Sequence, residues 1–330
     1  MIALFVAFAL VALIGCGAIV LDVGALYQER RELQNGADAA ALAVARDCAA
    51  GACGTYTTNA DLLADANADD GDSDVAEVCG NAPSLPACTD PPSVPDVAKY
   101  VRVTTSTRDA ESGGGEVRFG LARIFGEEGT TVEAASVVAY GPPGGLETIP
   151  VVFSMCEYLE AVPDPDLLPT GPPFAAGTEH YIYFHGSTPA GSCPAGPSGF
   201  DLAGGFGWLE TDGSCIADID EANWVDDKTG VAVPSVCDPS GWQNQILSIP
   251  FYDDTNGLTG SNGSYHIAGF SSLYVSGYRF PGSAWPSGFA CPEQAGGSGT
   301  CLRGHFVNAV VEGTEFGTLD LGTVMIKVIE

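Results

Sequence analysis

The chain has 330 residues, of which 45% are hydrophobic and only 16% are charged, so it is long enough for one large domain or two modest ones. Its 42 acidic residues outnumber its 12 basic residues, which gives a formal charge of -30 at pH 7. Because nucleic acids are bound through Lys and Arg side chains on phosphates, this charge excludes a nucleic-acid-binding protein and favours cations or basic partners.

The chain begins with an unbroken apolar run at residues 2–21, IALFVAFALVALIGCGAIVL. About 20 apolar residues in a helix span the hydrocarbon core of a bilayer. A cleaved signal peptide is the alternative, but the run lacks a basic start and is longer than the apolar region of such a peptide. The sequence therefore predicts a retained single-pass anchor that contacts membrane lipid through residues 2–21.

The helix is expected to continue beyond the anchor as an amphipathic stalk. One predicted helix face carries apolar side chains at spacings of seven, four, three and four residues: Leu26, Leu33, Ala37, Ala40 and Val44. Gly24, Asn35 and Gly36 are candidate bending points. We assign residues 1–47 to the anchor and stalk, and a linker helix without a role in assembly is the alternative.

Residues 18–45 of this predicted helix carry a long motif. It comprises Asp22-Val23-Gly24, Tyr27, Glu29-Arg30-Arg31, Leu33-Gln34-Asn35 and Ala37-Asp38-Ala39-Ala40-Ala41-Leu42. The segment resembles the N-terminal signature of the TadE/TadG-like family of Flp (tight-adherence, Tad) pilus-assembly proteins. Gly36 stands where alanine would be usual, which we expect to loosen the helix. From the motif we define the helix signature as Asp22, Gly24, Tyr27, Arg30, Arg31, Leu33, Gln34, Asn35 and Asp38.

A second block is similar to the TadG-like branch of this family. It comprises GGFGWLE at residues 204–210, two following cysteines, and residues 246–280. The resemblance implies a pilus-assembly or pseudopilin-like protein of the cell envelope with a role in adherence. Its implied partners are other Tad pilus or pseudopilin subunits and envelope assembly proteins. The family supplies no catalytic residues.

Eleven cysteines are present, and one of them, Cys16, lies in the apolar run. The ten others form an even set, which predicts disulfides and an oxidising compartment. Zinc is the alternative, but no C-x2-C pair occurs. Proximity along the chain predicts the pairs Cys48–Cys53, Cys79–Cys88, Cys156–Cys193, Cys215–Cys237 and Cys291–Cys301. Each is expected to contribute about 2–4 kcal/mol to stability.

The orientation of the anchor involves two opposing signals. Arg30 and Arg31 follow the span closely, and the positive-inside rule would place them in the cytoplasm. The ten cysteines favour the opposite orientation, and Glu29 and Glu32 flank the two arginines. We therefore expect an extracytoplasmic head on a bacterial cell membrane.

The rest of the chain predicts an α+β fold that is mostly β. Residues 48–145 are expected to form a small helix-on-sheet region: Cys-rich loops and short helices over 48–96, strands at 99–107 and 131–140, and a short helix at 117–125. The Gly/Pro segment at 141–145 is the candidate boundary. From residue 146 to 330, short apolar runs alternate with turn residues, which predicts a disulfide-stapled, β-sandwich-like domain.

Residues that could carry chemistry are few. No G-x-S-x-G motif occurs, and His180, His185, His266 and His305 lack H-E-x-x-H spacing. His266 and His305 lie in strand-like apolar runs, where a hydrogen-bonded core or sheet-face histidine is favoured over a catalytic one. Asp70, Asp72 and Asp74 alternate as in a calcium loop but lack its Gly and Glu. A second acidic cluster, Asp218, Asp220, Glu221, Asp226 and Asp227, is interpreted as a hydrated loop or a weak cation site.

Four tryptophans lie in or beside Gly/Pro-rich loops: Trp208, Trp224, Trp242 and Trp285. They could line a carbohydrate-binding or adhesin surface, although aromatic mini-cores that anchor loops are favoured. The sequence thus predicts a non-enzymatic structural or assembly component of a Tad-type pilus or pseudopilus, without cofactor, catalytic residue or metal site. A surface adhesin or cation-binding module is the alternative, and a secreted hydrolase is less favoured.

Overall fold

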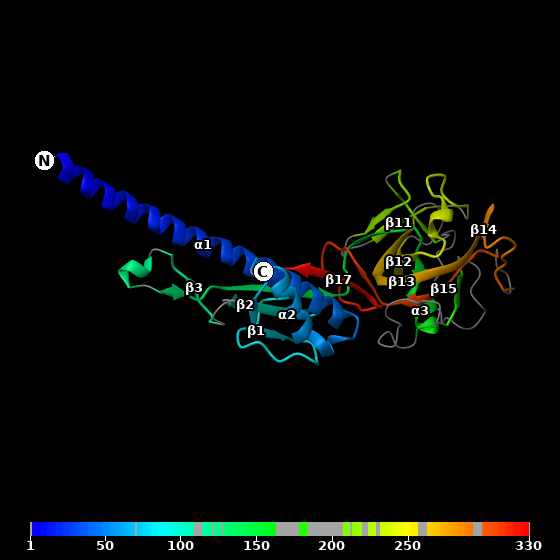
Figure 1. Cartoon of the computed structure of the whole chain (residues 1–330). Coiled ribbons are helices and arrows are strands. Elements are labelled where there is room, and N and C mark those ends of the chain that lie inside the picture. The colour runs from blue at the N-terminus through cyan, green and yellow to red at the C-terminus, as the bar shows by residue number, and fades with distance from the viewer. Residues whose placement is uncertain are drawn as a thin grey trace. The chain divides into compact units, whose positions relative to one another are not determined.

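The computed structural model of the chain divides into two compact units (Figure 1). It describes residues 2–69, 71–108, 114–120, 122–126, 128–162, 178–183, 207–211, 213–219, 224–228, 232–256, 263–292 and 299–329. Unit 1 comprises Met1–Val94, Lys99–Tyr140 and Lys327–Glu330, and unit 2 comprises Pro95–Ala98 and Gly141–Ile326.

The first element of unit 1 is α1 (Ile2–Ala49), a single helix of 48 residues that continues through Gly24, Asn35 and Gly36. The short helices η1 (Cys53–Thr55) and α2 (Tyr56–Ala66) follow it. Within the described residues, no helix combines the length and hydropathy needed to cross a bilayer. The anchor predicted at residues 2–21 is therefore not confirmed and stays a prediction.

The main strands of unit 1 are β1 (Ser73–Gly80), β2 (Lys99–Thr107) and β5 (Glu133–Gly141). They pair antiparallel in that order, and the Ile329 N–H donates to the Val137 carbonyl at 2.9 Å. The predicted strand at 99–107 is confirmed, and the one at 131–140 is confirmed from residue 133. β1 was predicted to be loop or short helix, which is wrong.

A two-stranded arm connects β2 to β5. It contains β3 (Val117–Arg118), the 3-10 helix η2 (Ala122–Phe125) and β4 (Gly129–Thr130). The helix predicted over 117–125 is therefore wrong at its start and holds only for the last four residues. β3 pairs with β4, so its backbone hydrogen bonds are made across the arm instead of along a helix.

The core of unit 1 lies between its helices and its sheet. α1 contacts β2, and α2 contacts β1. The C-terminal half of α1 buries one side, which we call the inner face: Leu33, Ala37, Ala40, Ala41, Val44 and Ala45. The small alanine side chains bring the helix backbone close to its neighbours. A helix-on-sheet arrangement is present as predicted, but α1 and α2 form it and not the helix predicted at 117–125.

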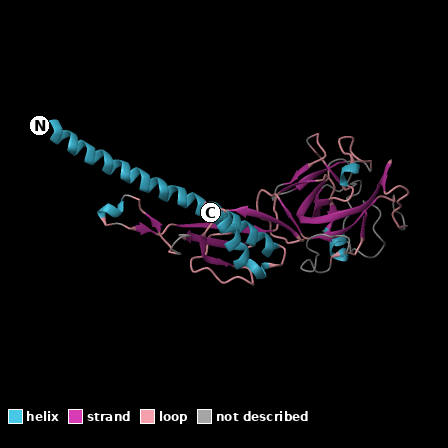
Figure 2. Ribbon diagram, in the orientation of Figure 1, coloured by secondary structure: helices cyan, strands magenta, loops and turns pink. Residues whose placement is uncertain are grey.

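Unit 2 is mostly strands (Figure 2). Its elements are β6 (Leu146–Thr148), β7 (Phe153–Ser154), α3 (Met155–Ala161), β8 (His180–Tyr183), β9 (Trp208–Leu209), β10 (Ala217–Ile219), β11 (Trp224–Lys228), η6 (Pro239–Trp242), β12 (Ile246–Asn256), β13 (Ser264–Phe280), β14 (Ser283–Trp285), β15 (Cys301–Val307), β16 (Ala309–Val311) and β17 (Thr323–Val328). α3 follows an apolar run that predicted only a strand.

The largest sheet of unit 2 is built on the long antiparallel pair of β12 and β13. Its order is β7-β12-β13-β11-β9, with β14 and β15 also pairing with β13, and β8 with β15. A separate ribbon joins β6 to β10. Mixed sheets in a β-rich region are thus confirmed, while the sandwich arrangement stays a prediction.

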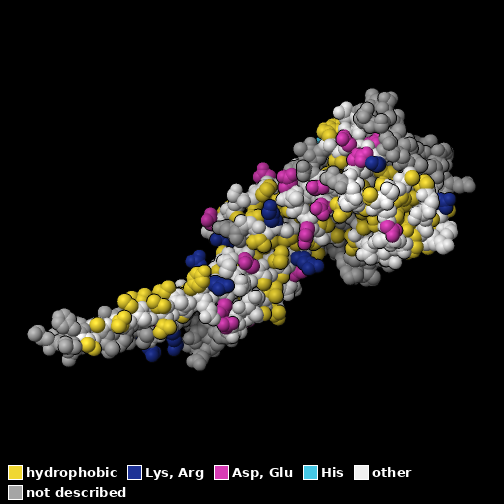
Figure 3. All heavy atoms as spheres, turned by 90° about the horizontal axis from the view of Figure 1, so that it is seen from above, with side chains coloured by type: hydrophobic (Ala, Val, Ile, Leu, Met, Phe, Trp, Pro, Cys, Tyr) yellow, Lys and Arg dark blue, Asp and Glu magenta, His cyan; other side chains and the backbone are white. Residues whose placement is uncertain are grey.

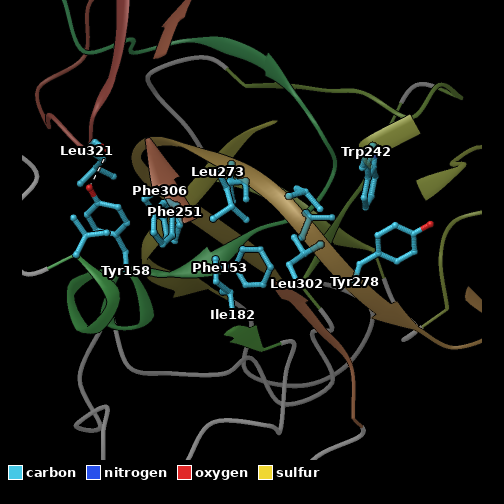
Figure 4. Packing of buried hydrophobic residues seen from close by; sticks show 14 of the residues in the cluster. Phe153, Tyr158, Ile182, Trp242, Phe251, Leu273, Tyr278, Leu302, Phe306 and Leu321 are labelled. Atoms are coloured by element: carbon cyan, nitrogen blue, oxygen red, sulfur yellow. Dashed lines mark hydrogen bonds between the residues drawn. The ribbon is translucent and has the colours of Figure 1, made fainter. Parts of the chain in front are cut away.

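Two apolar clusters form the core of unit 2. The larger one gathers aromatic side chains around Phe251, with Tyr158 of α3 and Phe306 of β15 at ring-centroid distances of 5.0 and 6.0 Å (Figure 4). The Tyr158 hydroxyl donates to the Leu321 carbonyl at 2.8 Å, and burial raises its pKa above the ordinary range. The second cluster includes Tyr252, Phe270 and Ile219. Aromatic packing thus supplies much of the core.

Four disulfides close loops in the described residues: Cys48–Cys53, Cys79–Cys88, Cys215–Cys237 and Cys291–Cys301. All four are pairs that proximity along the chain predicts. The side chains of the fifth predicted pair, Cys156 and Cys193, lie outside the part that the structure describes. Cys16 is an exposed free thiol.

Candidate functional site

The helix signature divides by its environment along α1. Asp22 and Leu33 are buried, and Gln34 and Asp38 are half-buried. The remaining members are exposed: Gly24, Tyr27, Arg30, Arg31 and Asn35. The buried and half-buried residues therefore hold the helix within unit 1, and the exposed residues are accessible to a partner.

Asp22 ties α1 to the arm of unit 1. Its two carboxylate oxygens accept hydrogen bonds from the Gly120 N–H at 2.8 Å and the Ala122 N–H at 2.7 Å. The side chain is only 8% exposed. Charge-assisted bonds of this kind are stronger than neutral ones. Asp22 therefore fixes the arm beside the helix at the first residue after the apolar run.

Polar side chains also join α1 to the sheet and to the segment after α2. The Gln34 amide donates to Asp38 and to the Ala135 carbonyl, both at 3.0 Å. Glu32 accepts from Gln28 at 3.0 Å and from the backbone N–H of Asp69 at 3.0 Å. These bonds fix the rotation of the helix about its axis, so they determine which side chains face outward.

Gly36 lies where α1 and α2 pack closely against each other. A Cβ atom at this position would stand 3.3 Å from the Ala64 Cα and 3.4 Å from its carbonyl oxygen. The glycine thus permits a close approach of two helices. The sequence signal for this was present, because glycine replaces the alanine that is usual in the motif.

The opposite side of α1 is exposed, and we call it the outer face: Val6, Leu13, Val20, Gly24, Tyr27, Arg31, Asn35 and Leu42. The large apolar members Val6, Leu13, Val20 and Tyr27 recur every seven residues, which places them on one side of a helix. Tyr27 is 67% exposed. Figure 3 shows apolar side chains along the rod formed by the N-terminal half of α1.

The first acidic cluster of the sequence forms structural contacts in unit 1. Asp72 pairs with Arg108 at 3.3 Å, Asp74 lies in β1, and Asp70 is outside the described residues. Asp65 accepts from the Ser73 N–H at 2.9 Å. Burial, and then the charges of Asp65 and Asp74, raise the pKa of Asp61 above its ordinary value.

The second acidic cluster lies in unit 2, where Asp220 and Glu221 are outside the described residues. Both carboxylate oxygens of Asp227 are buried, and neither has a hydrogen-bond partner among the described residues. Burial, and then Glu210 and Asp226, raise the Asp227 pKa. In the part of the chain that the structure describes, no group of three or more His, Cys, Asp or Glu side chains is placed to hold a metal ion.

Three histidines have distinct surroundings, and His185 lies outside the described residues. His305 is buried, as predicted for a core histidine, and neither ring nitrogen has a hydrogen-bond partner among the described residues. Burial lowers its pKa, and Glu179 partly opposes this. Burial and His305 lower the pKa of His180. His266 pairs with Asp253 on the sheet.

Three of the four tryptophan side chains pack in or against the core of unit 2. Trp208 and Trp242 are buried, and Trp285 packs against the larger apolar cluster. Trp224 differs, because it is 45% exposed beside His266.

Comparison with known proteins finds a family match for the N-terminal helix. Residues 1–47 match the family model described as putative Flp pilus-assembly TadE/G-like. No curated protein and no solved structure matches the chain. The match does not extend to the C-terminal half, so the TadG-like branch stays a prediction from residues 204–210 and 246–280. Together with the disulfides, the family match at residues 1–47 indicates an envelope or extracytoplasmic location.

Proposed function

We propose that this chain, whose residues 1–47 form a TadE/G-like Flp pilus-assembly domain, is a structural component of a Tad-type pilus or pseudopilus. In this proposal residues 1–47 are anchor and stalk, residues 48–145 are a pilin-like region, and residues 146–330 are a β-rich extracytoplasmic domain. The protein has no enzymatic role, and its partners are other pilus or pseudopilin subunits and envelope assembly proteins.

The observation that carries this proposal is the division of α1 into two faces. The inner face is buried against unit 1, while large apolar side chains of the outer face are exposed at seven-residue intervals. Contiguous apolar surface of this kind marks an interaction site. Seven-residue spacing suits packing against a second helix. A partner helix would cover Val20 and Tyr27 in an assembled structure.

Membrane anchoring is supported by the composition of residues 2–21. The run has no charged residue, and a helix of about 20 residues is about 30 Å long, the thickness of a bilayer core. Described side chains here are exposed on several sides of the helix, including Leu13, Ile19, Val20 and Leu21. Lipid or sister helices would remove this apolar surface from water.

An extracytoplasmic head is supported by the disulfides. Two of the four described disulfides lie in each unit, and disulfides persist in oxidising compartments. The lumenal or external side of the membrane therefore suits residues 48–330. Adherence would then follow from assembly of the pilus, with no catalytic step.

The experiment that tests the proposal is site-specific photocrosslinking in cells that make the full chain. A photoreactive phenylalanine analogue replaces Tyr27 on the outer face, and mass spectrometry identifies the adducts. We expect crosslinks to another pilus or pseudopilin subunit, or to a second copy of the chain.

Two matched positions serve as controls. The analogue at Leu33, a large buried side chain of the inner face, is expected to yield only crosslinks within the chain. The analogue at Asp218, exposed in β10, reports collisions at an unrelated surface. Equal yields of the same adducts at positions 27 and 218 would contradict the proposal.

A further inference from the structure

A cavity of about 390 Å³ lies in unit 2, beside the N-terminal part of β13. Asp253 of β12, His266 and Phe270 of β13, and Thr318 and Leu319 of the segment before β17 line it. It thus combines a carboxylate, an imidazole and a hydroxyl with apolar side chains. Such a mixture suits a ligand that has both hydroxyl groups and C–H faces.

Glycines build the wall of this cavity. A Cβ atom on Gly317 would stand 2.6 Å from the Pro143 carbonyl oxygen and 2.8 Å from the Gly144 Cα. A Cβ atom on Gly269 would stand 3.3 Å from the Leu319 carbonyl oxygen. These contacts hold the segment around residue 318 close to the strand. The wall is therefore made by tightly packed backbone.

A contact between His266 and Asp253 orients the polar side chains at one end of the cavity. Nδ1 of His266 lies 2.5 Å from Oδ1 of Asp253. Because Asp253 occupies Nδ1, the Nε2 atom is the one that can exchange hydrogen bonds with a ligand. A histidine fixed by a carboxylate thus faces the cavity with a defined orientation.

An exposed aromatic ring stands next to this pair. Trp224 is the register partner of His266 across β11 and β13, and the two ring centroids are 5.4 Å apart. Trp208 is fully buried, whereas Trp224 is 45% exposed. The exposed part of the Trp224 ring is accessible to a ligand next to the His266 side chain. An indole ring beside hydrogen-bonding groups can stack on the C–H face of a sugar ring.

We propose that Trp224, His266, Asp253 and Thr318 form a binding site for a neutral glycan. Trp224 stacks on one sugar ring, and the three polar side chains bind hydroxyl groups at the mouth of the cavity. An anionic sugar is excluded, because Asp253 and a chain of net charge -30 repel it. The site would serve surface attachment, and it does not depend on the proposed role in pilus assembly.

Isothermal titration calorimetry of the full chain tests this site. The protein is held in an amine-oxide detergent, because a maltoside headgroup is itself a sugar. The probes are maltotriose and chitotriose as neutral glycans and trigalacturonate as an anionic one. We expect saturable binding of at least one neutral trisaccharide at millimolar or lower concentration, and no binding of trigalacturonate.

Variants assign the binding to this site. Trp224→Ala is expected to weaken binding about tenfold or more, while Trp224→Phe retains most of it because a ring remains. Thr318→Ala, at an exposed position, is a second variant that leaves the core intact and is expected to weaken binding. Tyr27→Ala removes a ring of α1 that is 67% exposed, more than Trp224 at 45%, and is expected to leave glycan binding unchanged. Absence of binding by both neutral probes, equal binding of trigalacturonate, or unchanged affinity in Trp224→Ala and Thr318→Ala would overturn the proposal.

Discussion

The carboxylate of Asp22 accepts a hydrogen bond from the backbone N–H of Ala122 at 2.7 Å, although 100 residues of chain separate them. A second bond, from the Gly120 N–H at 2.8 Å, completes the contact. Replacement by alanine would remove both hydrogen bonds, but water can reach the two N–H groups, so the expected loss is about 0.5–1.5 kcal/mol for each bond. The contact therefore explains why an acidic residue stands immediately after an apolar run.

We expect Asp22→Ala to raise the rate of amide hydrogen exchange across β3, η2 and β4, with little change in β2. Asp22→Asn is expected to have a smaller effect, because its single amide oxygen can still accept one bond. Asn35→Ala, on the outer face, is the matched control and should leave the exchange unchanged. Unaltered protection of the arm in Asp22→Ala would show that other contacts hold it.

The contact of Gly36 with Ala64 gives a prediction about helix packing. Gly36→Leu introduces a side chain at a position where even a Cβ atom lies 3.3 Å from Ala64. Overpacking of this kind destabilises by about 1–3 kcal/mol. We therefore expect a lower melting temperature of the full chain in detergent, followed by circular dichroism.

Gly24→Ala is the matched control for this experiment. A Cβ atom at Gly24 has nothing within 4 Å, so the substitution adds only helix propensity, about 1 kcal/mol in favour of the helix. It is expected to raise or preserve the melting temperature. If Gly36→Leu were as stable as Gly24→Ala, the close packing of α1 on α2 would be refuted.

The disulfides are expected to differ in their effect according to the loops that they close. Cys215–Cys237 spans 22 residues and Cys48–Cys53 spans five. In the chain-entropy description, loss of the first destabilises by about 3 kcal/mol and loss of the second by about 2 kcal/mol. Double alanine variants, unfolded in urea, measure both values. A larger loss for the short loop would point to strain or packing as the dominant effect.

Much of the local structure of unit 1 could be predicted from periodicity. The strand at Lys99–Thr107 matches its predicted range because alternation of side chains coincides with burial. β1 (Ser73–Gly80) was missed, since its acidic residues and bulge obscure the alternation. Pairing with β2 makes it a strand, and such tertiary pairing overrides local propensity.

The candidate site was predictable only in part. The motif identifies Asp22 and Tyr27 as notable residues, and the helix period separates inner from outer face. It does not identify Gly120 as the partner of Asp22, because the two are 98 residues apart. The cavity beside His266 likewise joins strands with a segment about 50 residues further along the chain. Contacts at such separations depend on the fold, which local patterns do not encode.

The buried histidine of unit 2 gives a prediction about pH. His305 is 3% exposed, its ring nitrogens have no hydrogen-bond partner in the described part of the chain, and Tyr274 packs on it at a centroid distance of 5.0 Å. Burial lowers its folded pKa below the ordinary value of 6.5, despite Glu179. The unfolded chain therefore takes up a proton at a pH where the folded chain does not. The contribution of His305 to the free energy of unfolding is therefore fully present above about pH 6.5, and it is lost as the pH falls from there to the folded pKa.

Replacing His305 by phenylalanine removes this titration while keeping a ring against Tyr274. We expect the urea midpoint of unit 2 to fall between about pH 7.5 and about pH 5 in the parent chain, and to fall less in His305→Phe. Comparing the two chains cancels contributions from other groups. His180 retains a lowered pKa from its own burial, so some dependence on pH should persist. An identical fall in both chains would place the acid-sensitive group elsewhere.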